Sequence, residues 1–205
     1  LENGTQTITS DTLAAALPTW NTISNNTTQL VEAYHKDYPL RRGMAREELK
    51  SKLKLSPRIF NATITTLVIR QLIIETGKLI ARSGHTIQFN GQEQAKVQAL
   101  MRKFAANPFS PPSVKDCQAE VGEETLNALL EMNELITVST DVVFRKNDYD
   151  LLVTRIKDVL IQNGQIALAE VRDLFNTSRK YAQALLEHLD EIGFTKRDGD
   201  FRKLK

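Results

Sequence analysis

Two cations stand where a helix near the end of the chain is predicted to begin. Residues 176–205 read as one helix followed by a short basic hairpin, and Arg179 and Lys180 fall at the helix start. A helix N-terminus carries about half a positive charge, so cations there are disfavoured by some tenths of a kcal/mol. A local rule broken without visible compensation suggests a binding site. Phosphate would supply the missing negative charge, so the chemistry indicated is anion binding.

The hairpin that follows this helix adds further cations. An Asp-Gly pair at positions 198 and 199 predicts a two-residue turn. The strand alternation then places Arg197 and Arg202 on one face, which we expect to be exposed, and Phe194 and Phe201 on the core face. The wing and the helix start would together form a cleft for a phosphate backbone. The pairs expected from this turn are Arg197 with Asp200, Lys196 with Phe201, Thr195 with Arg202 and Phe194 with Lys203.

These elements belong to a plan that recurs three times along the chain, with a period of about 55 to 60 residues. Each copy reads as three helices and a β-hairpin, and each third helix ends in a similar pattern: IRQLII at residues 69–74, MNELIT at 132–137 and LDEIGF at 189–194. Apolar residues recur at helical spacing in every copy, which indicates helices buried on one face. Three helices plus a two-stranded wing is the winged-helix plan.

The predicted fold is therefore mainly α with small β-hairpins, an α+β chain of tandem winged-helix domains. Residues 1–26 read as the remnant of a preceding winged-helix domain and a connector containing Trp20. The predicted domains span residues 27–90, 91–146 and 147–205. The last of these carries the predicted phosphate cleft.

Composition excludes several classes of function. The 205 residues include 27 basic and 25 acidic side chains, which argues against a binder driven by overall positive charge. Cys117 is the only cysteine, so no disulfide framework is possible, and a small buried thiol is expected. His35, His85 and His188 form no metal-ligand spacing. We find no catalytic constellation, and no apolar run of the roughly 18 residues that a membrane span requires.

Charge differs between the repeats. Residues 40–58 hold seven basic and two acidic side chains, a net charge of +5. This segment is either a secondary basic patch or ordinary solvated surface. The middle repeat is acidic, and Glu123 and Glu124 at the start of its third helix would repel phosphate, which favours a spacer or protein-contact role. The patch consists of Arg41, Arg42, Arg46, Lys50, Lys52, Lys54 and Arg58.

Two segments carry a family resemblance. DLFNTSRKYAQALLEHLDEIGFTKRDGDFRKL at residues 173–204 and YHKDYPLRRGMAREELKSKL at 34–53 resemble the C-terminal winged-helix region of the bacterial selenocysteine-specific translation elongation factor. The resemblance implies that the last domain binds the messenger RNA hairpin that recodes a UGA stop codon, through its recognition helix and wing. The RNA-binding residues that it implies are Ser178, Arg179, Lys180, Tyr181, Lys196, Arg197, Gly199, Asp200 and Arg202.

The same resemblance sets expectations for partners and cofactors. The family is a GTPase, but no phosphate-binding loop is present here, so we expect a non-enzymatic fragment without catalytic, cofactor or metal residues. GTP and Mg²⁺ would belong to absent N-terminal domains, and so would selenocysteyl-tRNA. The expected partners are a stem-loop mRNA and the ribosome, and the basic patch is expected to face the ribosome or the tRNA. A cytoplasmic monomer without membrane contact is expected.

Two alternatives remain open at this point. A tandem winged-helix regulator of double-stranded DNA would place the third helix in the major groove. Gln183, Glu187 and Asp190 fall at the outward positions of that helix, and two acids there would face DNA poorly. A protein-interaction module is the other alternative, motivated by the acidic middle repeat.

Overall fold

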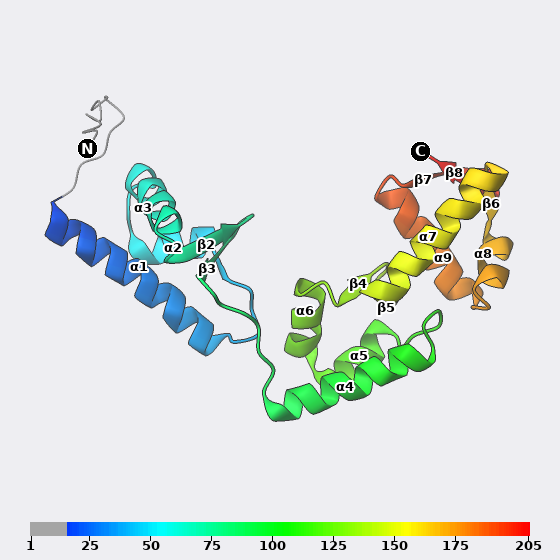
Figure 1. Ribbon diagram of the computed structural model, residues 1–205, viewed down its shortest axis with the longest axis horizontal. Coiled ribbons are helices and arrows are strands. Elements are labelled where there is room, and N and C mark those ends of the chain that lie inside the picture. The colour runs from blue at the N-terminus through cyan, green and yellow to red at the C-terminus, as the bar shows by residue number, and fades with distance from the viewer. Residues whose placement is uncertain (1–15) are drawn as a thin grey trace, which may run out of the picture. The chain divides into compact units, whose positions relative to one another are not determined.

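The computed structural model describes residues 16–205, and its contacts divide the chain into two compact units (Figure 1). The first unit ends at Gln88, and the second runs from Phe89 to Lys205. The remnant of a preceding domain that the sequence suggested lies largely in residues 1–15, outside the described residues.

The first unit is one winged-helix domain. Its three strands form an antiparallel sheet in the order β1-β3-β2, and its core includes Val31, Leu49, Phe60 and Ile80. In chain order the elements are α1 (Leu17–Asp37), β1 (Met44–Ala45), α2 (Arg46–Leu53), α3 (Pro57–Ile69), β2 (Ile73–Thr76) and β3 (Leu79–Arg82).

The first domain begins earlier than the sequence suggested. Helix α1 starts at Leu17, with Pro18 in its first turn. Proline is tolerated there because backbone N–H groups of the first turn have no partner within the helix. Ser24 and Thr27 are buried in this helix, and Trp20 packs against the core. Residues 17–26 are therefore the first half of a domain helix and not a connector.

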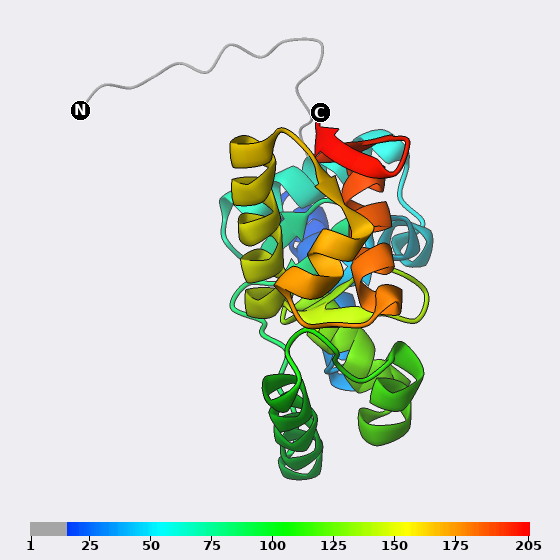
Figure 2. The same ribbon diagram turned by 90° about the vertical axis from the view of Figure 1, so that its right-hand side faces the viewer.

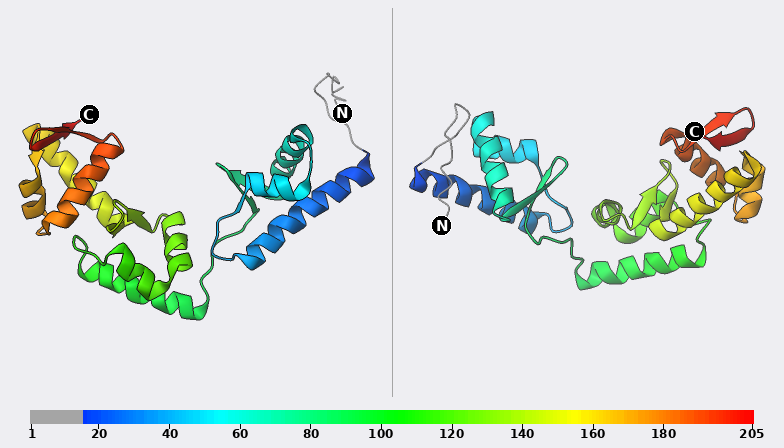
Figure 3. Two further views of the ribbon diagram at one scale, coloured as in Figure 1. Left: turned by 180° about the vertical axis from the view of Figure 1, so that it is seen from behind. Right: turned by 45° about the horizontal axis from the view of Figure 1, so that its top comes forward.

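The second unit opens with the middle domain (Figure 3). Its helices are α4 (Gly91–Ala106), α5 (Val114–Val121) and α6 (Glu123–Glu131), and its wing pairs β4 (Leu135–Thr137) with β5 (Val143–Arg145). Asn90 and Ser113 begin α4 and α5 with reciprocal capping bonds to Glu93 and Asp116. Cys117 is fully buried, as predicted, and burial raises the pKa of its thiol to about 11.

The last domain repeats the sheet order of the first, with strands in the order β6-β8-β7. Its elements are α7 (Lys146–Asn163), β6 (Ile166–Ala167), α8 (Leu168–Leu174), α9 (Arg179–Glu191), β7 (Thr195–Asp198) and β8 (Phe201–Leu204). In Figure 2 the β7–β8 hairpin is drawn in red at the end of α9. Gly193 follows α9 at φ +74°, a left-handed conformation that ends many helices.

The hydrophobic core of the last domain extends into the wing of the middle domain, whose helices also enclose a separate buried cluster of their own. Val142 and Phe144 of the middle wing belong to the same buried cluster as Ile156 and Leu185 of the last domain. The chain also passes from β5, which ends at Arg145, directly into α7 without a linker. Residues 89–205 therefore fold as one body that contains two winged helices.

The α+β fold with tandem winged-helix domains is confirmed. Among the described residues, none of the helices combines the length and the apolar character that crossing a membrane would require.

Candidate nucleic-acid interface

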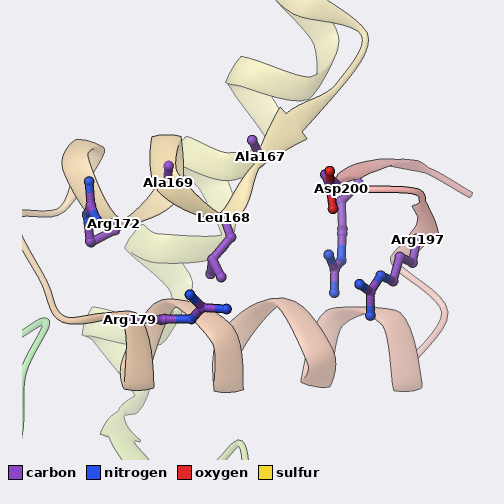
Figure 4. Close-up of a pocket in the computed structure, with 8 residues that line it drawn as sticks. Ala167, Leu168, Ala169, Arg172, Arg179, Arg197 and Asp200 are labelled. Carbon is purple, nitrogen blue, oxygen red and sulfur yellow. The ribbon is translucent and has the colours of Figure 1, made fainter.

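A pocket of about 320 Å³ lies between the start of α9, the α8 region and the wing of the last domain. Figure 4 shows Arg179 on α9 and Arg197 on the wing, both directed toward the space that separates these elements. Four guanidinium groups and one carboxylate line the pocket, so its electrostatic character favours an anion. Its lining residues are Ala167, Leu168, Ala169, Arg172, Arg179, Arg197, Asp200 and Arg202.

The start of α9 is open to a ligand. Ser178 is the N-cap residue with an extended backbone, and its side chain makes no capping bond. The first turn contains no acidic residue, and Arg179 is its first helical position. The first N–H groups of a helix have no partner within it, so their partial positive charge adds to that of Arg179. The helix start therefore has no side-chain capping bond and no acid in its first turn, and the anion site there stays a prediction.

The turn of the wing differs from the predicted one by one residue. Asp198 pairs with Phe201, so the turn residues are Gly199 and Asp200. Gly199 has φ +60° and takes the first turn position, where a type II′ turn requires glycine. The predicted register was therefore wrong, although Arg197 still shares a face with its new cross-strand partner, Arg202.

The face that carries the two arginines points toward α9, contrary to prediction. Arg202 has a side chain only 8% exposed, and its Nε donates to Oδ2 of Asp190 at 2.9 Å. Thr195, on the same face, is buried and donates its hydroxyl to Oδ1 of Asp190 at 2.6 Å. Phe201 was expected in the core but is 38% exposed. A polar contact to the helix, and not aromatic burial, therefore determines which side of the wing faces inward.

Lys180 and Tyr181 lie against the middle domain and not in the pocket. The Lys180 ammonium pairs with the carboxylate of Asp141, and this bond raises the pKa of the lysine. The Tyr181 hydroxyl donates to the carbonyl oxygen of Pro111 at 2.8 Å. Thr177, just before the helix, donates to the carbonyl oxygen of Phe109. These contacts hold the start of α9 on the neighbouring domain.

The lining of the pocket does not include Ser178 and Lys196, the remaining predicted RNA-binding residues. Ser178 and Lys196 are exposed, and Lys196 stands opposite Lys203 in the wing. Lys203 pairs with Asp198 at 2.7 Å and lowers the pKa of that carboxyl. The structure thus brings Arg179, Arg197, Asp200 and Arg202 together in the pocket, with Gly199 in the turn beside them.

Arg172 also lines the pocket, although it was not among the residues predicted from the sequence. It stands in the last turn of α8, lines the pocket, and its Nη2 lies 2.8 Å from a carboxylate oxygen of Asp173. A winged helix brings the end of its second helix close to the start of the third. This geometry could have predicted from the sequence that Arg172 lies near Arg179.

The basic patch of the first domain is dispersed over several elements. Arg46 lies over the ring of Phe60 and contacts Glu75 at 3.2 Å and Asn61 at 2.9 Å. Lys50 and Lys52 pair with Glu47 and Glu48 on their own helix, and Arg41 lies over the ring of Tyr38. Arg42 and Arg58 also make contacts, and Lys54 ends α2 in a left-handed conformation.

The outward face of α9 differs from the one expected. Asp190 turns to the wing, while Gln183 and Glu187 bond to each other at 2.8 Å on the exposed side. Among residues 16–205, no three His, Cys, Asp or Glu side chains are grouped so that they could hold a metal ion.

Comparison with known families gives two matches. The family described as "Elongation factor SelB, winged helix" matches residues 158–204 with its third-domain model and residues 28–81 with its second-domain model. These ranges contain the predicted cleft and the first-domain patch. The matches confirm the resemblance that residues 34–53 and 173–204 indicated.

Curated relatives are similar over most of this chain. The selenocysteine-specific elongation factor of Desulfomicrobium baculatum is 26% identical over 181 residues, which cover 84% of this chain and 28% of the relative. That of Escherichia coli is 24% identical over 184 residues, which cover 84% of this chain and 29% of the relative. The chain thus spans less than a third of the length of these relatives.

Two solved structures are also similar. The bacterial selenocysteine-specific elongation factor EF-Sec matches with a TM-score of 0.51 and 16% identity, over 92% of this chain and 30% of that one. This likeness supports the fold. The mRNA-binding domain of Escherichia coli SelB in complex with SECIS RNA matches with a TM-score of 0.47 and 28% identity, over 57% of this chain and 99% of that one.

Proposed function

We propose that this chain, which carries winged-helix domains of the elongation factor SelB family, binds the selenocysteine-insertion hairpin of messenger RNA and so directs the factor to recode UGA. The observation that carries the proposal is the arginine-lined pocket at the uncapped start of α9. It lies in the domain that matches the third SelB winged helix.

The shape and charge of the site favour RNA over duplex DNA. A-form RNA hides its base edges in a deep groove, so proteins read its unpaired bases and its shape. A pocket of about 320 Å³ is at the small end of ligand-binding pockets, a size that suits one unstacked nucleotide and its phosphate. Glu187 on the exposed face of α9 would face the phosphates of a DNA groove. The proposed contact is therefore local and made by the pocket and wing.

The middle domain is proposed to support the RNA site. It supplies Pro111 and Asp141, which hold Tyr181 and Lys180 at the start of α9. Its own third helix begins with Glu123 and Glu124, a start that repels phosphate. The middle domain is therefore proposed not to contact RNA directly. It would act as a spacer that also fixes the orientation of the last domain.

The remaining parts of selenocysteine incorporation are assigned to other regions of the elongation factor. We propose that the described domains bind RNA without catalysing a reaction and without GTP or Mg²⁺. Selenocysteyl-tRNA would be carried elsewhere in the factor, and the ribosome would be approached through the basic patch of the first domain. The proposed setting is the cytoplasm, where translation takes place, with the chain as a monomer.

The experiment that tests this function is fluorescence anisotropy with a bulged RNA hairpin, competed by a DNA hairpin of equal length and charge. We expect RNA to be preferred and the preference to be lost when the bulged or loop base is deleted. With about four phosphate contacts and a slope of about −0.7 per contact, a fourfold rise in salt should weaken binding roughly fiftyfold. Equal competition by DNA would reduce the site to a generic phosphate cleft.

A further inference from the structure

Asp190 occupies a position that is unfavourable for an acid. It stands in the last turn of α9, where the helix dipole presents partial negative charge and disfavours carboxylates. Its side chain is only 23% exposed. Two hydrogen bonds from the wing offset this unfavourable placement: Oδ1 accepts from Thr195 and Oδ2 accepts from Arg202.

The wing in turn needs an acid at this point. Arg197 and Arg202 are directly opposed across the β7–β8 ladder, and like charges at such positions destabilise a sheet. Arg202 is also nearly buried, and a buried cation is costly unless it is paired. The Asp190 carboxylate neutralises one of the two charges and provides the partner.

The geometry of the bond leaves Arg202 able to bind a second anion. Asp190 engages the Nε–H of the guanidinium, whereas the remaining N–H groups are carried by Nη1 and Nη2. Arg202 lines the pocket together with Arg179 and Arg197. A planar guanidinium that is held at one edge presents its other N–H groups in a fixed direction. The second bond, from the buried Thr195, fixes the carboxylate itself.

We propose that Asp190 is a positioning residue of the RNA site, whose carboxylate holds the Arg202 guanidinium so that its terminal nitrogens meet an RNA phosphate. This inference rests on the proposed function. According to this proposal, the negative charge of Asp190, at the end of α9, favours the binding of negatively charged RNA. Simple electrostatics gives the opposite sign, because removing a negative charge beside a cationic pocket should strengthen RNA binding.

The first test uses Asp190→Asn, which is isosteric, with Glu191→Gln as the matched control. Both remove one negative charge from the same turn, and Glu191 is exposed. In anisotropy with the bulged RNA hairpin, Asp190→Asn should weaken binding about tenfold, the effect of losing one charge-assisted hydrogen bond. Glu191→Gln should change the affinity by less than about twofold. Unchanged or tighter binding by Asp190→Asn would overturn the proposal.

A double-mutant cycle separates positioning from a general structural role. Arg202→Met should also cost about tenfold, and Asp190→Asn in the Arg202→Met background should cost no more, because the group to be positioned is absent. Both single variants should reduce the salt slope by about 0.7, the value for one lost phosphate contact. Additive losses of about a hundredfold would show that Asp190 acts independently of Arg202.

Arg202→Lys provides a test that does not depend on altering the acid. Lysine keeps the charge and can pair with Asp190, but its single ammonium cannot also present a planar fork to phosphate. It should therefore lose about tenfold in affinity, like methionine, and wild-type affinity for this variant would contradict the proposal. If the wild-type chain fails to bind the hairpin, the proposed function fails. If it binds and Asp190→Asn binds equally well, only this inference fails.

Discussion

The first and last domains share one fold and differ in how they arrange their cations. Both have a three-stranded sheet in which the strand preceding the second helix pairs with the last strand of the wing. In the first domain, Arg46 contacts Glu75, and Lys50 and Lys52 pair with acids of their own helix. In the last domain, Arg179 and Arg197 line a pocket at a helix start that has no acid in its first turn. The placement of cations relative to acids, and not their number, distinguishes the candidate site.

The largest expected effect comes from removing two cations from each domain in turn. Arg179→Ala with Arg197→Ala should weaken binding of the RNA hairpin about a hundredfold, since two hydrogen bonds to charged groups at about 1.5 kcal/mol each are lost. Lys50→Ala with Lys52→Ala removes the same charge from the first domain and should change affinity less than about twofold. Anisotropy at constant salt measures both. If both double variants lost the same RNA affinity, the last domain would not be the specific RNA site.

The stability of the pocket variant gives an internal check. Arg179 stands at the positive end of the helix dipole, so its removal should not lower the melting temperature of the second unit. A large loss of stability would mean that the lost affinity reflects unfolding.

The first domain should lose stability as the pH falls. His35 of the first domain stacks on His85 at 3.4 Å between ring centroids and accepts a hydrogen bond from the Arg82 backbone N–H at 3.2 Å. Its pKa is lowered from 6.5 to about 4, mainly by burial and then by His85 and Arg82. The unfolded chain therefore binds more protons between these values, so stability should be full above pH 6.5 and fall as the pH drops toward 4.

Trp20 provides the measurement, because it is the only tryptophan and packs in the first domain. In urea unfolding followed by Trp20 fluorescence, the first domain should lose about 1 kcal/mol between pH 7 and pH 5, an amount that allows for solvent screening of a partly exposed group. His35→Gln keeps an acceptor for Arg82 and should flatten this dependence. In the last domain, burial also lowers the pKa of His188. A pH dependence that persists in His35→Gln would assign the effect to other groups.

The smallest expected effect concerns the contact between the last domain and the middle domain. Tyr181→Phe removes the hydrogen bond to the buried Pro111 carbonyl and should lower the stability of the second unit by about 1 kcal/mol. Hairpin affinity should change less than about twofold, because this hydroxyl serves the domain contact. The Trp20 signal of the first domain serves as the control. A large loss of affinity with unchanged stability would return Tyr181 to the RNA site.

The repeat plan, the apolar helix faces and the position of Arg179 at a helix start could be read from the sequence, because each depends on local patterning. The turn of the wing could not be placed with certainty, since Asp198-Gly199 and Gly199-Asp200 are both acceptable turn pairs. The inward face was misassigned because Phe201 was expected in the core, whereas the bonds from Thr195 and Arg202 to Asp190 cross between elements.

The contacts of Lys180 and Tyr181 also could not be predicted from local sequence patterns. Their partners, Asp141 and Pro111, belong to a different repeat and come close only because the wing of the middle domain packs into the core of the last domain. The two cations at the helix start looked equivalent in the sequence. The fold separates them, so that Arg179 lines the pocket and Lys180 joins the neighbouring domain.

The absence of a linker between β5 and α7 determines where this chain can be cut and grafted. A fusion made at residue 146 would expose Val142 and Phe144 on one side and their partners in the last domain on the other. A fusion made before Phe89 keeps that shared core intact, since the boundary between the compact units falls there. The smallest transplantable module that contains the proposed RNA site, for engineering or for exchange between genes, is therefore the pair of domains and not the last domain by itself.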